Sequence, residues 1–282
     1  MSKIIICYLG VLLIGFSILN IGCQTKIDRR LNCICLIDYS GSLSDETLQR
    51  YIHIISSDVL SNLNIKDRLI VLPIDEGAKT EAVKLVYEDF SEKKYSKTSD
   101  GFTHASDSTM KRFHDYLEQL KPQLMIQLDS QKVVRSKFTY FTDIMAALEQ
   151  SEGLLETNEE DNFTTIFNRF ITGRNKLVSE NVIILFSDMI HESSEYNFNK
   201  PNGCDSKEAS SIINNLVQNK RMPNLKGSKI FVDGRTGHSN RMVENIRSFW
   251  SKYFKESHAD LIAYDFDIGN QIVSFLNNQR VK

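Results

Sequence analysis

The apolar positions of this chain form short, dense runs that are separated by polar segments. Such runs are typical of strands in a parallel sheet, because helices cover both faces of that kind of sheet. Three runs are expected to be buried strands: 31–38, 68–74 and 181–187. Two further strands are expected at 229–232 and 261–266, and an alternating segment within 82–90 is typical of an edge strand.

Between these runs, apolar residues recur with the period of a helix, as at Leu48, Ile52 and Ile55. Ser44 is expected to cap the start of this helix, and acidic residues follow it in the first turn. Other helices are expected at 109–128 with a break near Pro122, from residue 142, and at 207–220, 242–254 and 272–279. The alternation predicts a doubly wound, mostly parallel, Rossmann-like α/β sheet flanked by helices.

The N-terminus follows a different pattern. Lys3 precedes an almost continuously apolar stretch at 4–21, and Gly22 and Cys23 come next. This order of charge, apolar run and small residue is typical of a signal peptide. An uncleaved membrane anchor and plain secretion are the alternatives.

The segment around Cys23 resembles the bacterial lipobox, although Asn20 stands where that motif usually has leucine. The resemblance implies that 1–22 is a lipoprotein signal peptide, that Cys23 carries the lipid, and that 23–30 is a tether. The single α/β domain then occupies 31–282. The resemblance also implies a bacterial cell-envelope protein held on a membrane through its lipid, and Gln24 slightly favours the outer membrane.

Composition narrows the possible partners. The net charge is −2 for 282 residues, which gives no reason to expect nucleic acid. Cys33 and Cys35 are two residues apart on a predicted strand, so they are expected to be buried on one face. No disulfide framework is indicated, and the role of Cys204 is left open.

Candidate chemistry lies just beyond the predicted strands, where open α/β sheets place their sites. The loop 38–42 (DYSGS) follows the first strand, and Asp188 follows the third. Gly41 is expected in a turn that a side chain would crowd. Four other acids near strand ends are expected to be solvated: Asp75, Asp233, Asp265 and Asp267.

The loop 38–42 resembles the first metal-binding segment of von Willebrand factor A domains, which reads Asp-x-Ser-x-Ser. The segments 142–148 and 183–188 resemble the second and third loops of that family, so the resemblance covers roughly residues 31–270. It implies a metal-ion-dependent adhesion site built from Asp38, Ser40, Ser42, Thr142 and Asp188.

Two positions depart from the family pattern. Tyr140 and Phe141 stand where glycines are usual, which makes Thr139 a competitor of Thr142. Met189 replaces a frequent glycine, so a different turn is expected after Asp188.

Oxygen donors of this kind select hard cations such as Mg²⁺, Mn²⁺ or Ca²⁺. The resemblance implies that one coordination position stays open for an Asp or Glu carboxylate from a protein ligand of unknown identity. The expected function is therefore that of an exported, lipid-anchored binding protein.

Two alternatives remain open. One is an interaction or scaffold protein that keeps the fold without the metal. The other is a hydrolase, which we do not expect, because a dehalogenase-type phosphatase needs an aspartate where Ser40 stands and no Gly-x-Ser-x-Gly motif occurs. His191 and His238 are expected to be solvated loop residues.

Overall fold

The computed structural model describes residues 27–41, 43–76, 83–91, 94–95, 107–135, 141–158, 164–165, 171–172, 175–234 and 239–281. Contacts divide the chain into a larger unit, Arg29–Thr157 with Ser179–Lys282, and a smaller unit, Met1–Asp28 with Asn158–Val178. Within the smaller unit, the Asn175 amide donates a hydrogen bond to Asp28. The predicted signal peptide and Cys23 lie outside the described residues, so the boundary expected at 22 stays a prediction. The boundary expected at 30 also stays a prediction, and residues 27–30 are the first residues of strand β1.

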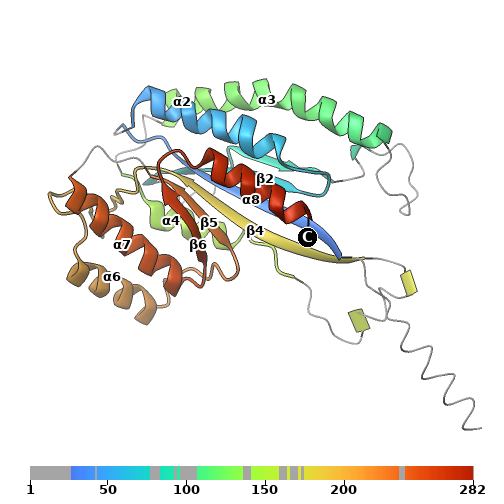
Figure 1. The fold of residues 1–282 in the computed structure, drawn as a ribbon. Coiled ribbons are helices and arrows are strands. Elements are labelled where there is room, and N and C mark those ends of the chain that lie inside the picture. Colours follow the sequence, from blue (N-terminus) through green and yellow to red (C-terminus); the bar gives the residue numbers. More distant parts are fainter. Residues whose placement is uncertain are drawn as a thin grey trace, which may run out of the picture. The chain divides into compact units, whose positions relative to one another are not determined.

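A sheet of six strands forms the centre of the fold, in the order β3-β2-β1-β4-β5-β6 (Figure 1). The strands are β1 (Ile27–Asp38), β2 (Arg68–Ile74), β3 (Val86–Asp89), β4 (Lys176–Phe186), β5 (Lys229–Asp233) and β6 (Asp260–Asp265). Strand pairing is parallel for β1–β2, β4–β5 and β5–β6, and antiparallel between β2 and the edge strand β3.

Hydrogen bonds between side chains fix the direction of the central pair β1 and β4. Asn32 bonds to Asn181 midway along the two strands, and Asp38 bonds to Ser187 at their ends. The two strands therefore run in the same direction, and the loops that follow them lie at one edge of the sheet. The predicted fold class is confirmed.

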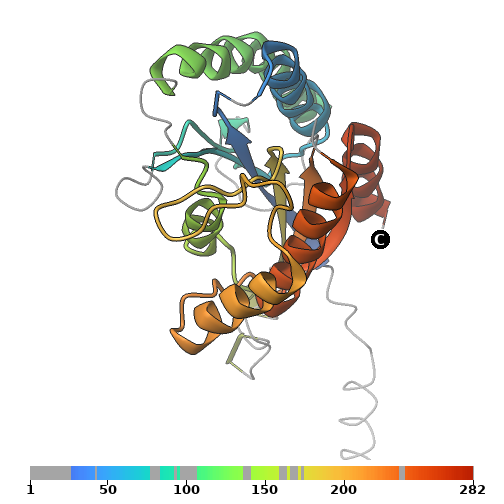
Figure 2. The ribbon, with the colours of Figure 1, turned by 90° about the vertical axis from the view of Figure 1, so that its left-hand side faces the viewer.

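Helices cover both faces of this sheet (Figures 1 and 2). One face carries α2 (Asp45–His53), its π-helical continuation η1 (Ile54–Val59), α3 (Asp107–Arg135) and α8 (Gly269–Val281). The other carries α4 (Ile144–Glu152), α6 (Ser206–Gln218) and α7 (Asn240–Glu256). Ser44 caps α2 by accepting a hydrogen bond from the Thr47 N–H, as the sequence predicts.

The break expected near Pro122 is wrong, because α3 continues through this residue to Arg135. Pro122 lies on the exposed side of the helix, where water can satisfy the carbonyl that the proline leaves unbonded. Buried Leu117 before it and Leu124 after it anchor the helix on the sheet. Packing on both sides of the proline therefore outweighs the lost hydrogen bond.

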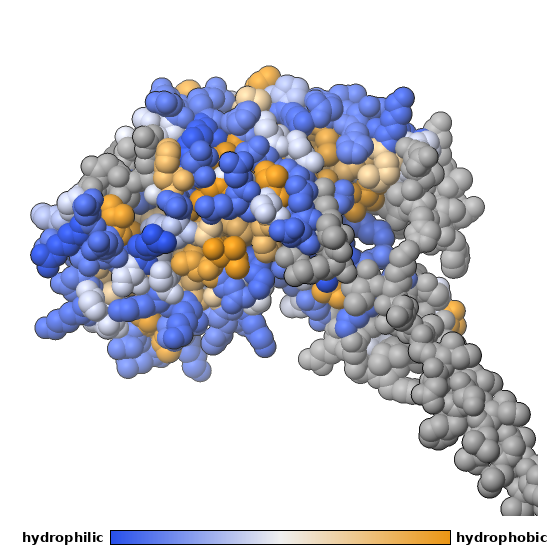
Figure 3. Space-filling view, viewed as in Figure 1, coloured by the Kyte–Doolittle hydropathy of each residue, from blue (hydrophilic) through white to orange (hydrophobic). Residues whose placement is uncertain are grey.

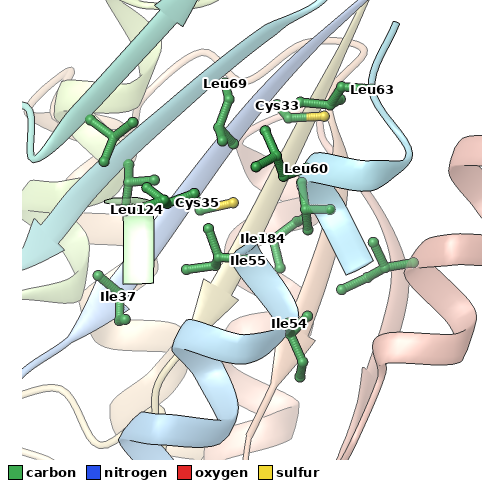
Figure 4. Close-up of a cluster of buried hydrophobic side chains, with 14 of the residues drawn as sticks. Cys33, Cys35, Ile37, Ile54, Ile55, Leu60, Leu63, Leu69, Leu124 and Ile184 are labelled. Atoms are coloured by element: carbon green, nitrogen blue, oxygen red, sulfur yellow. The ribbon is translucent and has the colours of Figure 1, made fainter. Parts of the chain in front are cut away.

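The core follows the alternation of β1 side chains between the two faces of the sheet. Leu31, Cys33, Cys35 and Ile37 pack toward one layer of helices, and Ile34 and Leu36 toward the other. Cys33 and Cys35 are free thiols among apolar side chains (Figure 4), which confirms the expectation for them. Burial raises the pKa of the Cys35 thiol, so it stays protonated.

The visible face in Figure 3 is mostly polar, with apolar side chains gathered over the edge strand β6. Ile262 of this strand is 48% exposed, and a register shift interrupts the pairing of β6 with β5 beside it. Among the described helices, none has the length and apolar character needed to cross a bilayer.

Candidate metal centre at the carboxyl edge of the sheet

Asp38 is the last residue of β1, and its side chain is fully buried. One carboxylate oxygen, Oδ1, accepts a hydrogen bond of 2.7 Å from the backbone N–H of Ser40. The other, Oδ2, accepts one of 2.9 Å from the Ser187 hydroxyl. The loop after β1 and the end of β4 together therefore fix the orientation of this carboxylate.

Asp188 lies two residues beyond the end of β4 and is only 6% exposed. Its Oδ1 accepts the N–H of Ile190 at 2.9 Å, which holds the loop in a tight turn. Burial, and next the negative charge of Asp188, raise the pKa of Asp38 to about 7, although hydrogen bonds from Ser40 and Ser187 oppose the rise. The two acids named by the sequence are thus brought together in a place that water does not reach freely.

Met189 adopts a backbone conformation with φ of 65°. This is the left-handed region that glycine occupies at no steric cost, so Met189 has a backbone conformation that glycine favours. The Met189 N–H donates to the Ser187 hydroxyl oxygen, and the Trp250 indole N–H donates to the Met189 carbonyl at 2.9 Å. Methionine keeps a glycine-like turn because hydrogen bonds hold both of its backbone groups.

Thr142 lies in the loop before α4 and is 3% exposed. Its carbonyl accepts the N–H of Glu192 at 3.0 Å, which joins this loop to the one that follows Asp188. Asp143 caps α4 by accepting the N–H of Ala146. Thr139, the competing candidate, lies outside the described residues.

The loop after β1 is described in part. Ser40 is half-buried and its side chain bonds to the Asp38 carboxylate, whereas Ser42 lies outside the described residues. The expectation of crowding at Gly41 is wrong, because a Cβ built there meets no atom within 4 Å. Its φ is not positive either, so the backbone at this position does not require glycine.

Two of the four other strand-end acids are buried ion-pair partners, which corrects the expectation that they are solvated. The fully buried Asp233 receives two hydrogen bonds of 2.7 Å from the Arg50 guanidinium. Asp75 is 2% exposed and pairs with Arg135. Asp265 and Asp267 are exposed as expected.

His191 is 1% exposed, so its assignment as a solvated loop residue is also wrong. Its Nε2 is 3.1 Å from the Ser193 hydroxyl, and its Nδ1 is 3.9 Å from Asp143, beyond hydrogen-bond distance. The rings of Phe198 and Trp250 pack against it, which explains why it is buried. His238 lies outside the described residues.

The five residues predicted as metal ligands do not include Ser187 or Trp250, which also contribute to this edge. Ser187 carries a hydroxyl at the end of a buried strand, which is a signal that the sequence does contain. Trp250 lies on α7, 61 residues from Met189, so no local pattern links it to this edge. Within the described part of the chain, no three His, Cys, Asp or Glu side chains group as metal ligands. The expected site has only two carboxylates, and its remaining donors are hydroxyls.

No family model matches the chain, and no curated protein is similar to it in sequence. Solved structures give weak similarities. An aerotolerance-related membrane protein from Bacteroides fragilis has 13% identity and a TM-score of 0.40, over 88% of this chain and 97% of that one. BatB from Bacteroides thetaiotaomicron has 13% identity and a TM-score of 0.42, over 88% and 99%.

A mutant of the PilB minor pilin from Streptococcus sanguinis has 10% identity and a TM-score of 0.44, over 92% of this chain and 62% of that chain. Similarity at this level assigns neither a family nor an activity. The argument for function therefore comes from the residues of the site.

Proposed function

We propose that this chain is a von Willebrand factor A-like binding protein that uses a divalent cation to hold an acidic group of a protein partner. One observation carries the proposal. Asp38 ends β1 and Asp188 lies two residues beyond the end of the adjacent strand β4, both are buried, and the negative charge of Asp188 contributes to the raised pKa of Asp38. Buried acids with like charges are unfavourable unless a positive charge balances them.

The donor chemistry fits a hard cation. Asp38 and Asp188 would supply two negative charges, and Ser40, Ser42 and Thr142 would supply neutral hydroxyl oxygens. An all-oxygen set with few carboxylates suits Mg²⁺ or Mn²⁺, with Ca²⁺ as the third possibility. The described donors support this fit, whereas Ser42 is included because of the sequence motif alone.

A bound cation would supply an electrophilic centre with one position open to a carboxylate from the partner. The chain's own residues do the positioning. The Ser40 N–H and the Ser187 hydroxyl fix the Asp38 carboxylate, and the Ile190 N–H fixes that of Asp188. The bond between Glu192 and the Thr142 carbonyl keeps the second loop beside the third. These residues position and bind, which favours a non-enzymatic role.

We further propose that the protein acts in the cell envelope, on a membrane through lipid at Cys23. The apolar segment 4–21 followed by Gly22 and Cys23 supports this location. Metabolic labelling with a fatty acid, followed by mass spectrometry of the mature N-terminus, tests it. Label on wild-type protein and none on Cys23→Ser is the expected result, and a free Cys23 or an intact residue 1 contradicts it.

Isothermal titration of the purified full-length protein with Mg²⁺, and then with Mn²⁺, tests the metal. We expect one ion per chain for wild type and no binding for Asp38→Asn, which keeps the side-chain shape and removes the charge. Asp265→Asn is the matched control, because Asp265 is an exposed acid at the end of the edge strand β6 of the same sheet. Absence of binding by wild type, or equal binding by Asp38→Asn, would overturn the proposal.

A further inference from the structure

The turn after Asp188 is held in a conformation that its sequence does not favour. Met189 has φ of 65°, and an L-residue with a Cβ is strained in this left-handed region. The side chain of Met189 is fully buried, so the turn cannot relax by moving into solvent. Something in the surrounding structure must therefore keep Met189 in place.

A chain of three hydrogen bonds does so, and its direction is unambiguous. The Trp250 indole N–H donates to the Met189 carbonyl at 2.9 Å, and an indole nitrogen can only donate. The Met189 N–H then donates to the Ser187 hydroxyl oxygen at 3.0 Å. The hydroxyl of Ser187 uses its single proton for Asp38 Oδ2 at 2.9 Å. A helix residue is thereby linked to a carboxylate of the proposed metal site.

Packing holds the first donor in this chain in place. Trp250 is fully buried on α7, and its ring contacts those of Phe249, Tyr253 and Phe254 at centroid distances from 5.1 to 5.9 Å. Phe198 packs against it from another segment. The indole N–H therefore meets the Met189 carbonyl at a position that the helix and its aromatic cluster determine.

We infer that Trp250 is a positioning residue for the metal site, which it supports by holding Met189 in the left-handed turn. The inference rests on the proposed function. Loss of the indole N–H lets Met189 leave the strained conformation, which moves Ser187 and Asp188 and so disturbs both carboxylates. Groups that orient metal ligands without touching the ion typically contribute about 10- to 100-fold to affinity.

Trp250→Phe tests this role, because it keeps an aromatic ring in the cluster and removes the N–H. We expect its Mn²⁺ affinity, measured by calorimetry on the full-length protein, to fall about tenfold. Phe249→Leu is the control, since Phe249 belongs to the same cluster and makes only ring contacts there. Its affinity should match that of wild type, and equal losses in the two variants would overturn the inference.

A rescue experiment separates strain from packing. Glycine accepts φ of 65° without help, so Trp250→Phe combined with Met189→Gly should recover the affinity that Trp250→Phe loses. Trp250→Phe combined with Met189→Ala removes nearly the same side chain but keeps a Cβ, and it should stay weak. Recovery in neither or in both double variants contradicts the inference. Thermal unfolding of each metal-free variant checks that it is folded at the titration temperature.

If the double variants do not fold, wild type still provides a test, because Trp250 is the only tryptophan in the chain. Mg²⁺ should change its fluorescence emission with the same affinity that calorimetry gives, and Asp38→Asn should abolish the change. Binding by calorimetry without any change in emission overturns the role of Trp250 and leaves the metal proposal intact. No binding by either method overturns both.

Discussion

Asp38 and Asp233 are two fully buried aspartates at the same edge of the sheet, and their charges are balanced differently. Asp233 at the end of β5 receives two hydrogen bonds from Arg50, whose guanidinium lies against the rings of Tyr51 and Phe266. Asp38 at the end of β1 receives hydrogen bonds from a hydroxyl and a backbone N–H, and the negative charge of Asp188 raises its pKa.

The difference separates a structural acid from a candidate ligand. At Asp233 the chain supplies the positive charge itself, so that carboxylate needs nothing from outside. At Asp38 the described residues supply hydrogen bonds that orient the carboxylate and no guanidinium or ammonium bonded to it. We therefore expect loss of its charge partner to destabilise the Asp233 site, and added metal to stabilise the Asp38 site.

Loss of the arginine should produce the largest effect. Arg50→Ala leaves Asp233 charged, buried and unpaired, and we expect the free energy of unfolding to fall by about 3–5 kcal/mol in urea denaturation. Lys229→Ala is the control, because the Lys229–Asp260 pair is exposed and contributes at most about 1 kcal/mol. Equal losses of stability in the two variants would show that the charge of Arg50 does not stabilise the buried Asp233 carboxylate.

The second largest effect should be the pH dependence of the stability of the metal-free protein, which we expect to arise from Asp38. Its pKa is about 7 in the folded state against an ordinary value of 3.8, so the folded state binds the proton more tightly than the unfolded state. Stability should therefore fall as pH rises from about 4 to 7, by a few kcal/mol, since one unit of pKa corresponds to about 1.4 kcal/mol. Asp38→Asn should lack this component, and identical pH profiles in the presence of a chelator would contradict the account.

Added metal should reverse this instability. At a concentration about 100 times the dissociation constant, Mg²⁺ should stabilise wild type by about 2.7 kcal/mol, because it binds the folded state alone. Thermal unfolding with and without Mg²⁺ measures the effect. Asp38→Asn should gain nothing, whereas Lys229→Ala should gain as much as wild type. A gain in Asp38→Asn would place the ion elsewhere.

The smallest effect is expected at Gly41. Its Cβ position is open and its φ is ordinary, so Gly41→Ala should change the free energy of unfolding by less than about 0.5 kcal/mol. Mg²⁺ affinity should also stay within a factor of about two, because the backbone of the loop is not strained. A large loss of affinity would mean that the loop closes around the ion in a way that leaves no room for a side chain.

The pattern of apolar runs could predict most of the fold, because β1, β2 and β4 are buried on both faces and their sequences reflect it. The same pattern located Asp38 and Asp188, since each lies at the point where a buried strand ends. The sequence predicts a helix break near Pro122 that does not occur, because Leu117 and Leu124 pack on the sheet. This packing is a tertiary effect, which local propensity does not contain.

The rest of the site depends on contacts between distant residues. Asp233 pairs with Arg50 across 183 residues, and no local pattern distinguishes such an acid from a solvated one. Met189 takes a conformation that favours glycine because Trp250, 61 residues away, bonds to its carbonyl. His191 is buried by rings that come from other segments. These features depend on contacts that form only in the folded chain, so no local pattern in the sequence could predict them.

A crystal structure of the protein grown with Mn²⁺, with anomalous scattering data collected, tests the central claim most directly. The account predicts one anomalous peak beside Asp38 and Asp188, with the Ser40 and Thr142 hydroxyls oriented toward it. It also predicts that the peak is lost in Asp38→Asn crystals grown in the same way. No peak at this edge, with the two carboxyl groups hydrogen-bonded to each other through a shared proton, would contradict it.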